Sequence, residues 1–133
     1  MKHILVVEDD AVNALLFRMI LEKRGNFQVT VTESPDEVLA LVRSGTVDLV
    51  IMDISLSHSR YEGKPVSGVD LCTLIKGDPA AFRIPVVLAT AHAMRGDAET
   101  LLRESGAEDY VAKPITDHAA FVEQIMSHLR EAA

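Results

Sequence analysis

Residues 4–10 read Ile-Leu-Val-Val-Glu-Asp-Asp, four consecutive apolar residues followed by three acids. A short, continuous apolar run is typical of a strand that is buried on both faces of a parallel sheet. Residues 47–53 repeat the pattern, since the run is apolar apart from Asp48 and ends on Asp53. Two such strands, each ending on acids, predict an α/β fold built on a parallel sheet.

The rest of the chain alternates between strand-like and helix-like segments. We expect further strands at residues 27–32, 84–89 and 110–112, and helices at residues 15–25, 34–42, 69–75, 98–105 and 118–130. The alternation predicts a doubly wound, five-stranded parallel sheet with five helices on its two faces. At 133 residues, the chain is expected to form one domain.

Composition excludes several classes of protein. Thirteen basic and 20 acidic residues give a net charge of −7, which argues against a nucleic-acid-binding module and against a polybasic membrane anchor. Cys72 is the only cysteine, so the chain has no internal disulfide. The apolar run at residues 4–7 is shorter than a signal peptide needs and no run is long enough to span a membrane, so we expect a soluble, cytoplasmic protein.

The residues that could take part in binding or catalysis stand at the ends of the predicted strands. Ligands of such sheets bind beyond the carboxyl ends of the strands. There the first strand supplies Glu8, Asp9 and Asp10, the third Asp53, the fourth Thr90 and the fifth Lys113. Carboxylates suit Mg²⁺, and a carboxylate near that ion could attack a phosphoryl group whose charge the ion, a lysine and a hydroxyl stabilise.

Each of these residues also has an ordinary explanation. The three acids could be solvated and open a helix, where negative charge is favourable. Asp53 could be a turn residue, and the Lys113-Pro114 pair could be a turn with a surface lysine. Four separate strand ends nevertheless all supply what one magnesium-assisted phosphoryl site needs, and this combination favours the chemical interpretation.

Four stretches resemble the receiver domains of two-component response regulators: residues 4–10, 48–54, 84–91 and 110–114. The resemblance extends across nearly the whole chain, and the order and spacing of the four stretches make it specific. Asn13 and residues 91–97 are most similar to stand-alone cell-division regulators and to the receivers of hybrid kinases. The resemblance implies a flavodoxin-like fold with strand order 2-1-3-4-5, and one receiver domain over residues 1–133 without an output domain.

The resemblance also implies a role for each residue of the site. Asp53 would accept a phosphoryl group from the phosphohistidine of a sensor histidine kinase or a histidine phosphotransfer protein. Asp9, Asp53 and the backbone carbonyl of Ser55 would bind Mg²⁺ directly, Glu8 would bind it through water, and Mn²⁺ would substitute. Asp10 would lie one step further from the ion. Self-phosphorylation and self-dephosphorylation would be the only intrinsic activities, so the protein would not be an enzyme in the usual sense.

A conformational switch is implied as well. Lys113 would contact the phosphoryl oxygens, and its bond to Pro114 would be cis. Thr90 would move toward the phosphoryl group while Tyr110 turns inward, which shifts the population between two packed states. A downstream protein would then bind the face of the fourth helix, fifth strand and fifth helix, about residues 94–129, and the protein would be a monomer or a weak dimer.

Two features leave alternatives open. Ser55 and His92 stand where this family tunes the phosphoryl lifetime, but His92 could equally be an exposed residue at the start of a helix. Residues 55–67 form an extended loop after the third strand, longer than in most receivers by about seven residues. Residues 57–67 of it could be a tolerated surface insertion, because loop length costs little entropy, or a flap that selects partners or covers the site.

Rival functions fit less well. A haloacid-dehalogenase-type phosphatase needs a second aspartate two residues after the nucleophile, where this chain has Ser55. A flavodoxin-like electron carrier needs a phosphate-binding loop after the first strand, where this chain has acids that would repel the flavin phosphate. A degenerate receiver that acts as a phosphorylation-independent scaffold is the remaining alternative.

Overall fold

The computed structural model describes residues 1–56, 59–91 and 95–131. Its central sheet has five parallel strands, which are β1 (His3–Val7), β2 (Gln28–Thr32), β3 (Leu49–Asp53), β6 (Val86–Thr90) and β7 (Asp109–Ala112). Their spatial order is β2-β1-β3-β6-β7. This order confirms the predicted 2-1-3-4-5, because β4 and β5 belong to a separate two-stranded sheet.

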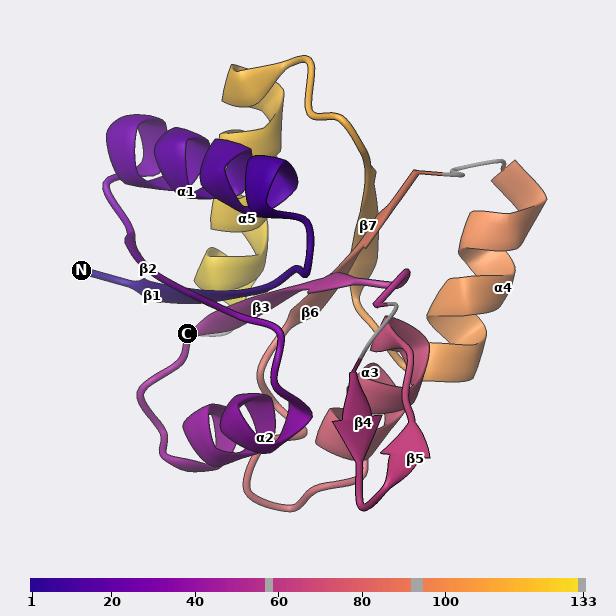
Figure 1. Ribbon diagram of the computed structural model, residues 1–133. Coiled ribbons are helices and arrows are strands. Elements are labelled where there is room, and N and C mark those ends of the chain that lie inside the picture. The colour runs from indigo at the N-terminus through magenta and orange to yellow at the C-terminus, as the bar shows by residue number, and fades with distance from the viewer. Residues whose placement is uncertain (57–58, 92–94, 132–133) are drawn as a thin grey trace.

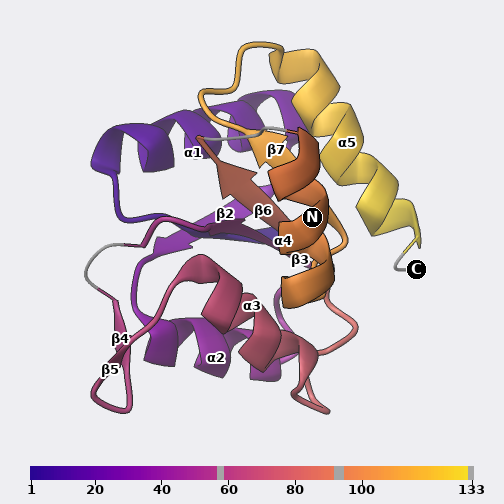
Figure 2. The same cartoon turned by 90° about the vertical axis from the view of Figure 1, so that its right-hand side faces the viewer.

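Helices cover both faces of the sheet (Figures 1 and 2). Helices α1 (Ala11–Gly25) and α5 (His118–Glu131) lie on one face, and α2 (Pro35–Arg43), α3 (Gly68–Lys76) and α4 (Arg95–Ser105) lie on the other. Alternate strand residues therefore enter two separate apolar cores. In β1, Ile4 and Val6 face the core under α1 and α5, while Leu5 and Val7 face the core under α2 and α3.

Local sequence signals explain where several helices begin and end. Ser34 caps α2 by accepting a hydrogen bond from the backbone N–H of Glu37, and Pro35 occupies the first turn as predicted. Helix α1 ends at Gly25 as predicted, and Asn26, the next residue, adopts the left-handed conformation (φ 55°) that closes a helix.

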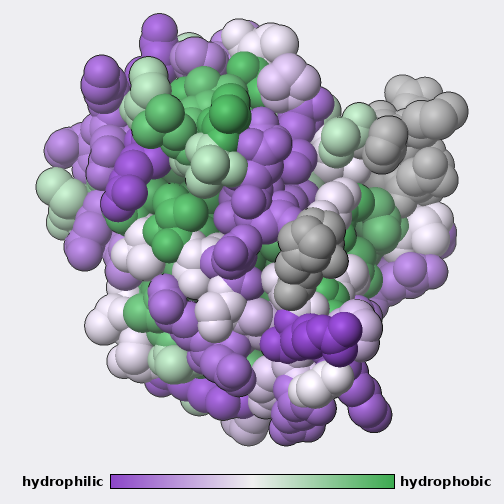
Figure 3. Space-filling model, in the orientation of Figure 1, coloured by the Kyte–Doolittle hydropathy of each residue, from purple (hydrophilic) through white to green (hydrophobic). Residues whose placement is uncertain are grey.

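The apolar residues at helical spacing that predict α1 include Leu15, Met19 and Ile20, and only part of this repeat lies on the buried face. Phe17, Ile20 and Leu21 are buried against the sheet, whereas Leu15 and Met19 are 59% and 43% exposed. Figure 3 shows the resulting hydrophobic surface over α1, in the upper part of the view. The helix itself is confirmed, but part of its apolar stripe faces solvent.

The extended loop expected at residues 55–67 contains a short hairpin. Strand β4 (Arg60–Tyr61) pairs with β5 (Lys64–Pro65) in antiparallel fashion. Strands of two residues are too short to show an alternating pattern, so the sequence indicated only a loop. Within the described ranges, no helix combines the length and apolar character that crossing a membrane requires.

Candidate functional site

Three acids meet at the carboxyl edge of the sheet. Glu8 follows β1, Asp9 comes next in the chain, and Asp53 is the last residue of β3. One carboxylate oxygen from each lies within 4.8 Å of the others, and Glu8 and Asp53 are buried. Because β1 and β3 are adjacent and parallel, the fold itself places these side chains together. The predicted convergence of the strand ends is therefore present in the structure.

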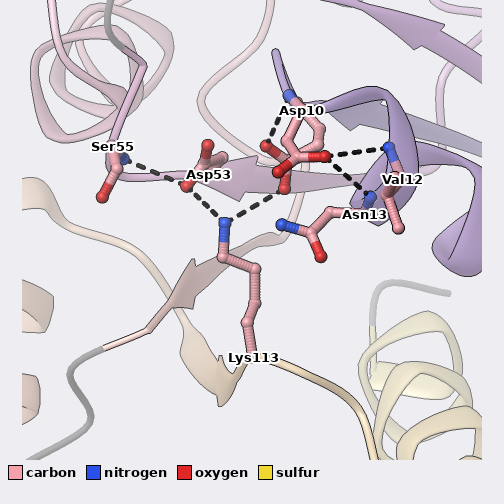
Figure 4. A network of polar contacts seen from close by, with 7 residues as sticks. Asp10, Val12, Asn13, Asp53, Ser55 and Lys113 are labelled. Carbon is pink, nitrogen blue, oxygen red and sulfur yellow. Dashed lines mark hydrogen bonds and ion pairs between the residues drawn. The ribbon is translucent and has the colours of Figure 1, made fainter.

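Lys113, just after β7, reaches across this edge to two of the acids (Figure 4). Its Nζ donates to Oδ1 of Asp53 at 2.9 Å and to Oε1 of Glu8 at 3.1 Å. The backbone N–H of Ser55 also donates to Oδ1 of Asp53, at 3.1 Å. Burial by itself would lower the pKa of Lys113, but its bonds to Asp53 and Glu8 outweigh burial and raise it. The lysine is thus held as a cation between two carboxylates.

The acids outnumber the cation that faces them. Burial, together with the hydrogen bond to Asp53 and repulsion from it, raises the pKa of Glu8 to about 7, although Lys113 acts in the opposite direction. The site holds three carboxyl groups, two of them buried, and one lysine. The acidic groups therefore exceed the single positive charge. Oxygen donors crowded in this way suit a hard divalent cation such as Mg²⁺.

Asp10 has a different position from its two acidic neighbours. Its side chain is the N-cap of α1, accepting from the backbone N–H groups of Val12 at 2.8 Å and Asn13 at 3.3 Å. Its own backbone N–H donates to Oε2 of Glu8 at 3.2 Å. The ordinary explanation, an acid that opens a helix, therefore applies to Asp10, while its backbone helps to orient Glu8.

The fourth and fifth strands complete the edge. Thr90, the last residue of β6, is 1% exposed, and its carbonyl accepts from the backbone N–H of Lys113 at 2.8 Å. The Lys113–Pro114 peptide bond is cis, as the resemblance implies. Tyr110 lies in β7, partly buried against the core under α2 and α3. His92 lies outside the described residues.

The sequence places Gly68 at the start of the helix after the loop, and it is the first residue of α3, but the sequence analysis gave it no role in the site. A Cβ at this position would lie 2.0 Å from the carbonyl oxygen of Asp53, so only glycine lets the helix approach the strand end so closely. Its N–H donates to the carbonyl of Ile54 at 3.4 Å. The signal was present in the sequence, because Ser67 and Asp70 form a capping box around this glycine.

The chain is similar in sequence to known proteins over nearly all of its length. A sequence model of the response regulator receiver domain matches residues 4–125. The polar-differentiation response regulator DivK of Brucella ovis is 38% identical over 131 residues, covering 98% of each chain. The same regulator from Brucella anthropi is 37% identical over 131 residues, again with 98% of each chain covered.

Solved structures share the fold over the whole chain. A putative response regulator from Chloroflexus aurantiacus is 25% identical with a TM-score of 0.82, covering 97% of this chain and 98% of its own. The receiver domain of a sensor histidine kinase from Pseudomonas aeruginosa is 26% identical with a TM-score of 0.80, over 97% and 98% of the two chains. That protein was crystallised with a magnesium ion coordinated in its active-site cleft.

Proposed function

The chain belongs to the response regulator receiver domain family, and from this premise we propose that residues 1–133 act as one receiver domain whose phosphoacceptor is Asp53. The observation that carries the proposal is the contact of Lys113 with a buried aspartate that ends a central strand and lies beside two further acids. The phosphoryl group would come from a phosphohistidine on a sensor histidine kinase or a histidine phosphotransfer protein.

In the proposed transfer, a carboxylate oxygen of Asp53 attacks the phosphorus atom of the phosphohistidine. An O–P bond forms as the N–P bond breaks, and the imidazole leaves with the bonding electron pair. Lys113, 2.9 Å from Asp53, is placed to stabilise the negative charge on the phosphoryl oxygens. Attack by water on the acyl phosphate later regenerates the Asp53 carboxylate and releases inorganic phosphate.

A divalent cation fits the same group of oxygens. Asp9, Asp53 and the carbonyl of Ser55 would hold Mg²⁺ directly and Glu8 through water, with Mn²⁺ as a substitute. When bound, the ion supplies positive charge that offsets the carboxylates and the phosphoryl oxygens. Glu8 is held for this role by Lys113 on one oxygen and by the backbone of Asp10 on the other.

Phosphorylation would change the surface through Thr90 and Tyr110. The Thr90 hydroxyl would bond to the phosphoryl group, and Tyr110 would turn into the space that the threonine leaves. The backbone of Tyr110 is tied to α5, because its carbonyl accepts from Nε2 of Gln124 at 3.0 Å. A groove of about 400 Å³ runs between β7 and α5, within the face that we propose for the downstream protein.

The exposed stripe of α1 is the proposed contact for the phosphoryl donor. Val12, Leu15 and Met19 are 76%, 59% and 43% exposed and follow one another at helical spacing. Val12 lies only three residues after Asp9, so a protein that covers this stripe would reach the acidic residues of the site. Burial of these apolar side chains would hold a donor while its histidine reaches Asp53.

The test is labelling with acetyl phosphate, a small donor that needs no docking surface. Wild type should gain one phosphoryl group in the presence of Mg²⁺, measured by intact-protein mass spectrometry. Asp53→Asn and wild type in EDTA should gain none. Failure of wild type to become labelled would contradict the phosphoacceptor role and favour the scaffold alternative, in which the protein binds partners without phosphorylation.

A further inference from the structure

The insertion after β3 is a folded unit with its own hydrogen bonds. Within residues 59–66, which we call the rim hairpin, Arg60 pairs with Pro65 and Tyr61 with Lys64. The turn residues Glu62 and Gly63 both have positive φ, 53° and 80°, as a tight two-residue hairpin turn requires. The backbone N–H of Val66 donates to the carbonyl of Ser59 at 3.1 Å and closes the unit.

The rim hairpin is attached to the body of the domain at two places. Ser59 is buried, and its hydroxyl donates to the carbonyl of Glu33 at 2.9 Å, in the connection between β2 and α2. Tyr61 packs against the core under α2 and α3. Figures 1 and 2 both show β4 and β5 beside α2 and α3. The hairpin is therefore held in one place relative to the site.

Its position places it on the border of the site. The insertion leaves the sheet directly after Asp53 and returns at Gly68, whose N–H meets the carbonyl of Ile54. The rim hairpin lies on the α2 side of the sheet, whereas α1, the helix that carries the exposed stripe, lies on the opposite face. A protein that brings a histidine to Asp53 would therefore lie between the rim hairpin on one side and the exposed stripe of α1 on the other.

The rim hairpin carries two basic residues, Arg60 and Lys64, and one acid, Glu62, which give it a net charge of +1 on a protein of net charge −7. Arg60 and Lys64 are both exposed, and Arg60 donates to the carbonyl of its own turn at Gly63. Neither forms an ion pair with a carboxylate among residues 1–56, 59–91 and 95–131. Two exposed cations in the loop that follows Asp53 can attract acidic side chains of a partner.

We propose that the rim hairpin is a second docking element for the protein phosphodonor, and that Arg60 and Lys64 select donors with acidic side chains beside the phosphohistidine. This inference rests on the proposed phosphoacceptor role of Asp53. It distinguishes this chain from receivers with a short loop, because the contact comes from the insertion itself. A small donor such as acetyl phosphate cannot use it.

The experiment compares protein and small-molecule donors on the same variants. The test variant is Arg60→Glu with Lys64→Glu. The matched control, Lys2→Glu with Arg83→Glu, makes the same charge change on exposed residues that precede β1 and β6, at the opposite end of the sheet. A third variant replaces residues 60–65 by Asn-Gly, because the backbones of the flanking residues already bond to each other across the hairpin.

The protein donors are the cytoplasmic portions of histidine kinases from the same genome, each phosphorylated with ATP and assayed separately. We expect the test variant to lose about ten-fold in the second-order rate constant of transfer at low salt, from the kinase that labels wild type fastest. The loss should shrink at high salt, since the charges are exposed and screened. The shortened variant should show a similar loss, and acetyl phosphate should label all variants at the wild-type rate.

Equal transfer rates for wild type and both hairpin variants, or an equal loss in the matched control, would overturn the proposal. Loss of labelling by acetyl phosphate in the hairpin variants would overturn it too, because the hairpin would then act on the site and not on docking. Failure of acetyl phosphate to label wild type would instead refute the proposed function on which the inference rests.

Discussion

A methyl group added at Gly68 tests how closely α3 and the proposed phosphoacceptor depend on each other. The Cβ of Gly68→Ala would lie 2.0 Å from the carbonyl oxygen of Asp53, 2.7 Å from its carbonyl carbon and 2.8 Å from the Cα of Ile54. All three are backbone atoms, so no side-chain rotation relieves the contact. Since real Cβ atoms stay at least 3.0 Å away, the helix and the strand end must separate by 3.0 − 2.0, about 1 Å.

The cost follows from this displacement. Forcing extra atoms into packed regions destabilises proteins by about 1–3 kcal/mol, and contact with rigid backbone puts this site at about 3 kcal/mol. For a domain of this size, that corresponds to a fall in Tm of about 10 °C. A shift of about 1 Å in a reacting group reduces rates by about 10²-fold, so labelling of Asp53 by acetyl phosphate should slow to that extent.

The assay is urea denaturation followed by circular dichroism, together with the initial rate of labelling by acetyl phosphate. Gly77→Ala is the matched control, because Gly77 caps the other end of α3 with φ −87° and the nearest neighbour of its Cβ would be the Thr73 carbonyl oxygen at 3.4 Å. We expect this control to stay within about 1 kcal/mol of wild type and to keep its labelling rate.

Two results would refute the reasoning. A Gly68→Ala protein within about 1 kcal/mol of wild type would show that α3 moves away from β3 without loss of stability. A destabilised variant that is labelled at the wild-type rate would show that the helix position does not control the Asp53 carboxylate.

Three further predictions concern charged groups. Lys113→Met should slow labelling by acetyl phosphate by about 10²-fold or more. An unchanged initial rate would contradict the proposed role of this lysine in stabilising the phosphoryl oxygens. The pKa of Glu8 is about 7 in the folded protein and ordinarily 4.5, so the folded state keeps a proton that the unfolded chain has lost between these values. In EDTA, the free energy of unfolding should therefore fall as the pH rises from 5 to 7 and then level off, by about 1.4 kcal/mol per unit of pKa increase. Glu8→Gln should flatten this dependence in urea titrations, and an equal slope in the variant would contradict the assignment. Lys76→Met removes a donor to the carbonyls of Phe82 and Ile84, at 3.2 and 2.8 Å, and breaks the ion pair with Glu108 at 2.7 Å, and should cost about 2 kcal/mol by urea denaturation. Glu22→Gln breaks the exposed ion pair with Arg18 and should cost less than about 0.5 kcal/mol. Equal costs for the Lys76 and Glu22 variants would contradict the expectation that the contacts of Lys76 contribute more to stability.

Local chemistry explains why so much of the fold was predictable. An uninterrupted apolar run such as residues 4–7 suits a strand buried on both faces, and the structure buries all of these residues. The start of α2 was predicted because Ser34 and Pro35 act on their own backbone neighbours. The boundaries were less accurate, since β3 starts at Leu49 and not at residue 47, and α1 starts at Ala11, where Asp10 provides the cap.

Long-range packing explains what the sequence analysis did not predict. The exposure of Leu15 and Met19 depends on how α1 is rotated against the sheet, and the apolar repeat does not determine this rotation. The rim hairpin depends on a buried contact between Ser59 and Glu33, 26 residues apart in the chain. Neither feature has a local pattern that distinguishes it from an ordinary helix face or a polar loop.

The sequence alone therefore determined the alternation of strands and helices. It also determined which acids, threonine and lysine stand at the carboxyl ends of the strands. Parallel strands place their carboxyl ends together, so a list of strand ends was already a list of candidate site residues. Only the tertiary structure decided that Lys113 bonds to both Glu8 and Asp53, that Asp10 caps a helix, and that Gly68 holds α3 against Asp53. These are distances between segments far apart in the chain, and packing, not local pattern, sets such distances.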